Sequence, residues 1–346
     1  MKLVLLVLAL AFPLTQASAA QLVTDKASGC KIVDEEAAPD HTVRWSGPCS
    51  GGIAEGNGAA EFLAGNNVIR RVEASFSKGV AIGQIKVTRY KNGAISTVTE
   101  FARGNGADET VQKVSFYRDG AVTSIESGQW SGGKLNGSCS VERYAGGKIV
   151  KSSSGACANG APAGPAKVRF YASSPSHDLL YEGLYLNGKL EGQGESSELL
   201  AAAPALPAES CLRIGDVTWH YVGEWKANLM NGQGTIESHF CAATPDGVVH
   251  HIDMKAAGSW IDSGQDGETV AEYATDGGAP TKIKRVYDHG ALVSEALADP
   301  PAPPAGTPPA KKDGAESREA VCRNMPWLCN EHTFDAAPFA KVQVNR

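Results

Sequence analysis

The chain has 346 residues, a formal net charge of -6, 39 glycines and only 7% aromatic residues. The negative charge argues against a nucleic-acid partner, because binding to phosphates depends on Lys and Arg. The shortage of large side chains argues against a thick conventional core, and the many glycines favour a thin sheet with tight turns.

Residues 1–20 have the features of a secretory signal peptide. Lys2 precedes an apolar run over residues 3–14, and residues 17–20 are small, as a cleavage site requires. The run is shorter than the roughly 20 residues that a membrane-spanning helix needs. The sequence therefore predicts export, to the periplasm or, as the alternative, out of the cell.

A repeat follows a short leading segment, residues 21–44, which we expect to cap it. Residues 181–194 and 221–234 align without gaps, with aromatic residues at positions 1 and 5 and glycine at positions 3, 12 and 14. A third copy begins at residue 45, and weaker copies begin at residues 72, 99, 126, 153 and 256. Tyr90, Tyr117, Tyr144 and Tyr171 share the resulting spacing of 27 residues. We expect the array to span residues 45–296.

The spacing has a physical interpretation. Positions 1, 3 and 5 of a strand point to one face, so two aromatic rings flank a bare glycine. We expect that glycine to leave room for a ring from the neighbouring hairpin. Pairs such as Asn187-Gly188 favour a tight turn in which φ is positive. The expected structural glycines are Gly47, Gly183, Gly192, Gly194, Gly223, Gly232 and Gly234.

The pattern Tyr-x-Gly-x-Trp/Tyr followed by Gly-Lys-x-x-Gly-x-Gly resembles the MORN repeat, most clearly in residues 181–194 and 221–234. The resemblance implies an all-β fold, an elongated single-layer antiparallel sheet of stacked hairpins. It also implies a scaffold or a membrane-associated module without catalysis of its own. The period here is longer than that of the common MORN unit, which implies longer connecting turns.

Two inserts interrupt the expected array, near 195–217 and 242–255. Residues 297–315 predict a stiff Pro-rich linker, and residues 316–346 a short tail, which with the linker we expect to be disordered. All eight cysteines follow the signal peptide, and an even number in an exported chain favours disulfides. The expected pairs are Cys30 with Cys49, Cys139 with Cys157, Cys211 with Cys241, and Cys322 with Cys329.

Metal and catalytic sites have weak sequence support. Suitable zinc ligands gather in the sequence, but without the spacing of a known zinc motif; they are Cys211, His220, His239, Cys241, His250, His251 and Asp253. The carboxylate pairs Glu55 with Glu61 and Glu191 with Glu195 are more simply explained as solvated strand residues. We expect no catalytic residue, no metal and no cofactor.

An aromatic row is the best candidate for function. Equivalent repeat positions hold Trp45, Trp130, Tyr181, Tyr185, Tyr221, Trp225 and Trp260. These rings either form the core or, where exposed, bind a partner, since aromatic residues are common interface anchors. The candidate partner-binding residues are Tyr181, Tyr185, Tyr221, Trp225 and Trp260.

The sequence thus favours a non-enzymatic exported scaffold of the cell envelope, whose partner is another envelope protein. One alternative is an envelope hydrolase or ligand-modifying enzyme that uses the concave face of the sheet. The other is attachment to a membrane surface.

The mature chain should begin at Ala20 or Gln21, because the apolar run is short and small residues follow it. N-terminal sequencing of protein purified from the native host measures this directly. An intact Met1 would contradict export and, with it, the argument for disulfides.

Overall fold

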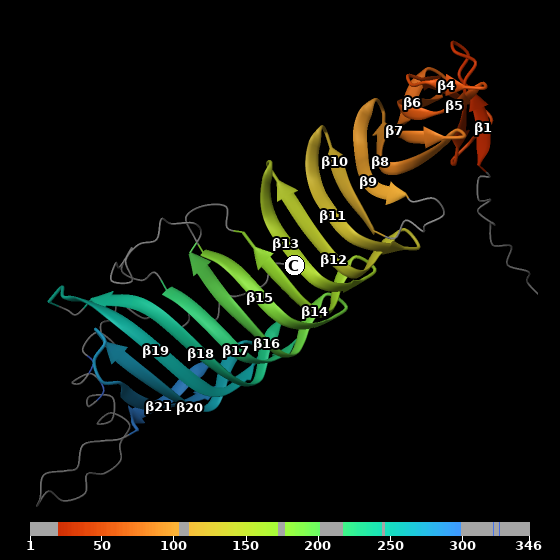
Figure 1. Cartoon of the computed structure of the whole chain (residues 1–346). Helices are drawn as coiled ribbons and strands as arrows, with labels where there is room; N and C mark the ends of the chain where they lie inside the picture. The colour runs from red at the N-terminus through yellow and green to blue at the C-terminus, as the bar shows by residue number, and fades with distance from the viewer. Residues whose placement is uncertain are drawn as a thin grey trace, which may run out of the picture. The chain divides into compact units, whose positions relative to one another are not determined.

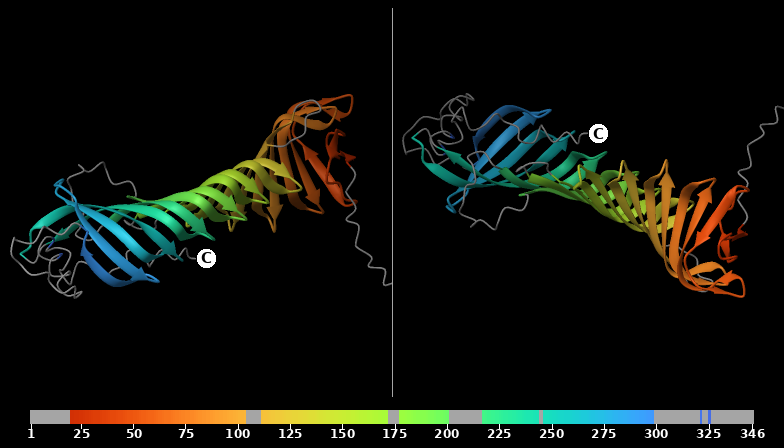
Figure 2. Two further views of the ribbon diagram at one scale, coloured as in Figure 1. Left: turned by 90° about the horizontal axis from the view of Figure 1, so that it is seen from below. Right: turned by 90° about the horizontal axis from the view of Figure 1, so that it is seen from above.

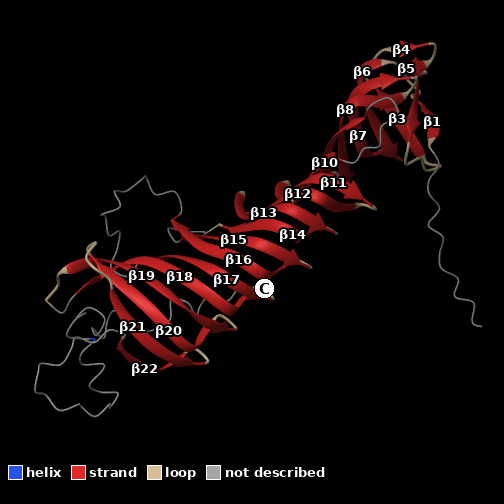
Figure 3. Cartoon of the chain, turned by 60° about the horizontal axis from the view of Figure 1, so that its bottom comes forward, coloured by secondary structure: helices blue, strands red, loops and turns tan. Residues whose placement is uncertain are grey.

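The computed structural model describes residues 20–103, 111–171, 177–200, 217–243 and 246–298, together with Val321 and Met325. It divides into two compact units, Met1–Val122 and Thr123–Arg346, which are described separately. Among these residues only Val321 is helical, and the rest form strands, turns and short connections (Figures 1 and 3). The expected all-β fold, a layer of stacked antiparallel hairpins, is confirmed.

The first unit contains a small four-stranded sheet and the start of a large one. The small sheet has the order β1-β2-β5-β4, formed by β1 (Gln21–Thr24), β2 (Lys31–Asp34), β5 (Ile53–Ala54) and β4 (Cys49–Ser50). In the large sheet each strand pairs antiparallel with the next: β3 (His41–Trp45), β6 (Gly56–Ala64), β7 (Asn67–Ser77), β8 (Val80–Lys91), β9 (Ala94–Arg103) and β10 (Val111–Arg118).

The second unit is a continuous meander in which every strand pairs antiparallel with its successor (Figure 2). Its strands are β11 (Ala121–Ser131), β12 (Lys134–Ala145), β13 (Lys148–Ala158), β14 (Ala161–Phe170), β15 (His177–Leu186), β16 (Lys189–Leu200), β17 (Val217–Lys226), β18 (Leu229–Ala243), β19 (Val249–Ile261), β20 (Gly264–Thr275), β21 (Thr281–Asp288) and β22 (Ala291–Leu297).

Two-residue turns join most of these strands. In the pair Asn187-Gly188 φ is 52° and 78°, and in Asn92-Gly93 it is 53° and 79°, the geometry of a type I′ turn. Two strands and two such turns make up one 27-residue period. The expectation of longer connecting turns is therefore wrong: the length of the unit lies in its strands, such as the 12 residues of β12 and the 11 of β13.

Several repeat glycines make room for aromatic rings, largely from their own hairpin. A Cβ at Gly183 would instead meet Leu190, one at Gly232 would meet Glu224, and one at Gly192 would meet nothing within 4 Å. A Cβ at Gly223 would meet the Tyr221 ring and would lie 2.6 Å from the Cα of Gly234, its partner on β18. A Cβ at Gly194 would lie 3.1 Å from the Trp225 ring of the next hairpin. The expected contact between neighbouring hairpins thus holds at Gly194, while Tyr221 covers the glycines of its own hairpin.

The Trp45 copy follows the same packing rule but a different path. The Trp45 ring occupies the space that a Cβ at Gly47 or Gly58 would need. Between Trp45 and Gly56, however, the chain leaves the large sheet to form β4 and β5 of the small one. The large sheet itself begins with β3 at His41, inside the segment expected to be a cap.

Two of the expected disulfides are present. Cys30 is joined to Cys49 and Cys139 to Cys157, with Cα atoms 5.9 and 6.1 Å apart. The second bond crosses β12 and β13, which the Gly146-Gly147 turn brings together. Cys241 is also disulfide-bonded. The expected partner Cys211, and Cys322 with Cys329, lie outside the described residues, so those two pairings remain predictions.

The described residues also delimit the inserts. The first insert lies between β16, which ends at Leu200, and β17, which begins at Val217, and its central part, 201–216, is outside the described residues. Most of the Pro-rich linker and of the tail is also outside them. Most of the second lies within β18 and β19. No described helix has the length and apolar character needed to cross a membrane.

Replacing Gly223 with Val should lower the free energy of unfolding by about 1–3 kcal/mol, because the new side chain overlaps the Tyr221 ring and the Gly234 backbone. Chemical denaturation measures the change. Val222→Thr is the matched control, since Val222 is 47% exposed and surface substitutions usually change stability by less than about 0.5 kcal/mol. Equal stability of the two variants would contradict the ring-on-glycine packing.

Candidate functional site

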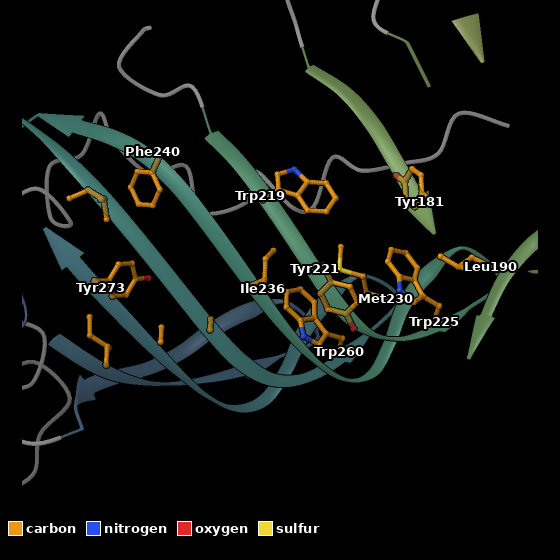
Figure 4. Packing of buried hydrophobic residues seen from close by; sticks show 14 of the residues in the cluster. Tyr181, Leu190, Trp219, Tyr221, Trp225, Met230, Ile236, Phe240, Trp260 and Tyr273 are labelled. Atoms are coloured by element: carbon orange, nitrogen blue, oxygen red, sulfur yellow. The ribbon is translucent and has the colours of Figure 1, made fainter. Parts of the chain in front are cut away.

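The five candidate aromatic residues all lie in the core of the second unit. Their side chains are 6% exposed or less and belong to one hydrophobic cluster on one face of the sheet (Figure 4). Val321 and Met325, from beyond the last strand, belong to the same cluster and are themselves buried. This burial favours the interpretation that the rings are the core and argues against their direct exposure to a partner.

Edge-to-face contacts connect these rings, within β17 and across from β15 to β17 and from β17 to β19. Tyr181 meets Trp225 at 5.9 Å between centroids, and Trp225 meets Tyr221 at 5.3 Å. Tyr221 in turn meets Trp260 at 5.3 Å. Such contacts stabilise by about 0.5–1.5 kcal/mol each beyond the burial of area. The ladder expected from the repeat therefore exists here as a packed interior row.

The other two rings of the expected row pack elsewhere. Trp45 lies in the first unit, 4.7 Å from Phe76 between centroids. Trp130 packs against a small cluster with Leu135 and the Cys139–Cys157 disulfide.

A hollow of about 280 Å³ interrupts this packing beside Tyr181 and Tyr185. Phe170 and Val168 from β14 also line it. Tyr181 and Tyr185 are thus both core residues and the wall of a cavity.

The hydroxyl groups of two core tyrosines differ in their partners. The Tyr221 hydroxyl donates to the Glu224 carbonyl at 3.3 Å, whereas the buried Tyr181 hydroxyl has no partner among the described residues. Burial, followed by the charge of Glu198, raises the pKa of Tyr181 to about 12. Burial likewise raises the pKa of Tyr221, so neither phenol is suited to proton transfer near neutral pH.

The opposite face of the same strands is exposed, and none of the residues predicted to bind a partner lies on it. Apolar side chains there alternate with the buried rings and are 38–64% exposed: Leu184, Leu186, Val222, Ile261 and Val270. For four of them the sequence signal is an even position within the repeat, where side chains point away from the aromatic positions, whereas Val270 lies on the return strand of its copy.

Comparison with known families supports the repeat assignment. The MORN repeat model matches residues 127–146, 181–196 and 221–238. The chain is a MORN repeat protein. Two matches coincide with the clearest copies, at residues 181 and 221, and the third falls on the weaker copy that begins at residue 126, whereas the matched segments do not include the Trp45 copy. No curated protein matches the chain in sequence.

Ion pairs accompany the exposed apolar residues on the outward face of the MORN array. Lys167 lies 2.5 Å from Glu182, and Lys255 lies 2.7 Å from Glu237. The hydrogen bond from Lys255, and then its charge, lower the pKa of Glu237. Pairs this exposed contribute little to stability. They mainly set the charge pattern that a partner would meet.

The carboxylates considered for catalysis have structural contacts. Glu195 lies 3.1 Å from His220, and Glu61 forms an ion pair with Arg71 at 3.1 Å. Glu191 and Glu55 accept backbone hydrogen bonds, from Ala227 at 3.0 Å and from Lys78 at 2.8 Å. These contacts join neighbouring strands and hairpins of the array.

The histidine-rich group does come together where β18 and β19 pair. His239 lies 2.8 Å from Asp253, and its ring stacks on that of His251, with centroids 6.0 Å apart. His250 pairs instead with Asp276 at 2.7 Å. Cys241 is 3.8 Å from His251 but is disulfide-bonded, so it offers no thiolate to a metal. The arrangement is a hydrogen-bonded strand pair.

Replacing Tyr181 with Phe should leave the free energy of unfolding unchanged or raise it, because the substitution removes a buried hydroxyl that has no partner. Tyr221→Phe is the matched comparison and should lower it by about 0.5–1.5 kcal/mol, through loss of the bond to Glu224. Urea unfolding of both variants tests this. An equal loss of stability in the two would show that the Tyr181 hydroxyl has a partner.

Proposed function

We propose that this MORN repeat protein is a non-enzymatic, exported scaffold of the cell envelope that binds another envelope protein through the outward face of its array. MORN repeats generally mediate interactions with proteins or membranes. The observation that carries the proposal is the difference between the two faces of the sheet. The aromatic rings are buried in the core on one face, while exposed apolar side chains recur on the other, from Leu184 on β15 to Val270 on β20.

A surface of this kind suits distributed recognition. In a repeat array each unit contacts its neighbours, so a binding face is spread over several hairpins by construction. The outward apolar residues lie between half-exposed ion pairs, which is the composition of an apolar interface with a polar rim. No single ionisable group is needed, in contrast to an enzyme.

Export is supported by cysteine chemistry. The Cys30–Cys49 and Cys139–Cys157 disulfides fit a non-cytoplasmic protein, because reducing systems in the cytosol keep most thiols reduced. The signal-like residues 1–19 lie outside the described residues. Their role is part of the proposal.

A photo-crosslinking amino acid at position 222 tests the function in living cells of the native host. A scaffold should give one discrete protein adduct in the envelope fraction. Leu184→Glu should reduce the yield of that adduct severalfold by placing a charge on the apolar face, whereas Glu191→Gln should leave it unchanged.

Circular dichroism should show that both variants are folded before their yields are compared. Residence of the protein in the cytoplasm would contradict the proposal. So would the absence of a protein adduct from outward positions, and an adduct with lipid alone would favour the membrane alternative. A Glu191→Gln variant that binds normally but loses a measurable turnover would favour the enzyme.

A further inference from the structure

A second hollow, of about 210 Å³, lies on the inner face of the large sheet in the first unit. Polar side chains form much of its wall. The apolar part comes from adjacent strands of the sheet and includes Phe62, Val72, Phe76, Ile85, Val87 and Phe101. This hollow has no part in the scaffold function proposed above.

Three arginines line the same hollow: Arg70 on β7, Arg89 on β8 and Arg103 on β9. Arg70 and Arg89 stand directly opposite each other in the register of β7 and β8. Like charges in that position repel, so the sheet alone would be destabilised by this arrangement. Among the residues that line the hollow, those on the strands of the large sheet include these three positive charges and no acidic side chain.

The counter-charges come from the segment that follows β2. The single oxygen Oε1 of Glu36 lies 2.9 Å from Arg70 and 2.5 Å from Arg89. Both carboxylate oxygens of Glu35 accept from Arg103, at 2.6 and 3.1 Å. The Glu35 and Glu36 side chains are 51% and 52% exposed, and ion pairs this open to water are weak.

Arg70 differs from the other two arginines because it is held in place. Its side chain is 8% exposed, it pairs with fully buried Asp34, and its guanidinium lies 4.3 Å from the centroid of the Phe62 ring. Its Nε nevertheless is buried without a hydrogen-bond partner among the described residues. A buried donor left unpaired is costly and calls for an acceptor.

We propose that this hollow binds a small carboxylate with an apolar tail, and that Glu35 and Glu36 occupy the arginines until the ligand displaces them. An apolar cavity of about 150 Å³ accepts benzene, so 210 Å³ suits a chain of medium length. The tail replaces empty apolar space, and the carboxylate meets the fork of Arg89 or Arg103, a geometry that guanidinium groups favour.

Isothermal titration of the full-length protein with octanoate, and with 1-octanol as the uncharged analogue, tests the proposal. Octanoate should bind with a submillimolar dissociation constant and at least about tenfold more tightly than octanol, because only the carboxylate reaches the arginines. The double variant Glu35→Gln with Glu36→Gln should bind octanoate more tightly than the parent, since the internal competitor is removed. Unchanged binding of octanol by the same variant shows that the gain comes from the carboxylate and not from apolar surface exposed by misfolding.

Removal of the arginine charges should have the opposite effect and weaken the binding of octanoate. Arg89→Gln with Arg103→Gln should weaken octanoate binding about tenfold or more and leave octanol unchanged. Arg71→Gln is the control, because Arg71 on β7 forms a partly exposed ion pair, with Glu61 at 3.1 Å, and does not line the hollow. Equal affinity for octanoate and octanol, no octanoate binding at millimolar concentration, or unaltered affinity in the glutamate variant would each overturn the proposal.

Discussion

A ring lying on bare backbone is the interaction on which this array depends. A single layer of strands can bury only one face, and that face must supply a core without a second sheet to pack against it. Glycine at the positions beside Tyr221 and opposite it lets the ring lie down on its own hairpin. The next ring then stacks edge to face against it. Adding one methyl group at such a glycine removes the space for the ring, so these glycine positions are expected to tolerate the fewest substitutions in the array.

The same constraint explains why chemistry is sparse on the buried face. Aromatic rings, aliphatic side chains and glycines occupy most inward positions of β15, β17 and β19, which leaves few inward places for ionisable groups. Charged residues therefore collect on the outward face, where they pair across strands in water. Some ion pairs are nevertheless buried in both units. In the second unit Asp178 is buried and pairs with Arg169. In the first unit Arg70 and Asp34 are buried next to a hollow that the sheet does not fill.

Much of the fold could be predicted because its rules are local. The turn pair Asn187-Gly188 and the spacing of Tyr90 and Tyr117 are visible in the sequence and reflect one strand pair per period. The path between Trp45 and Gly56 could not be predicted, because those residues follow the repeat pattern yet join a different sheet. The arginine hollow was equally hidden, since it requires residues 35 and 36 to meet strands more than thirty positions later. Burial of Tyr181 and Trp225 followed from packing between hairpins, which a one-dimensional pattern leaves open.

The two-residue turns also restrict how such a protein can change its length in evolution. Each turn reverses the direction of the chain. A strand therefore has the same direction and equivalent neighbours only as the strand two places further along the sheet. Duplication of a whole period preserves the stacking of every later ring on its glycine. Duplication of half a period would place a strand of the wrong polarity beside Tyr221 or its counterparts. Arrays of this kind are therefore expected to grow and shrink by whole hairpins of two strands, and their lengths across species should differ in steps rather than continuously.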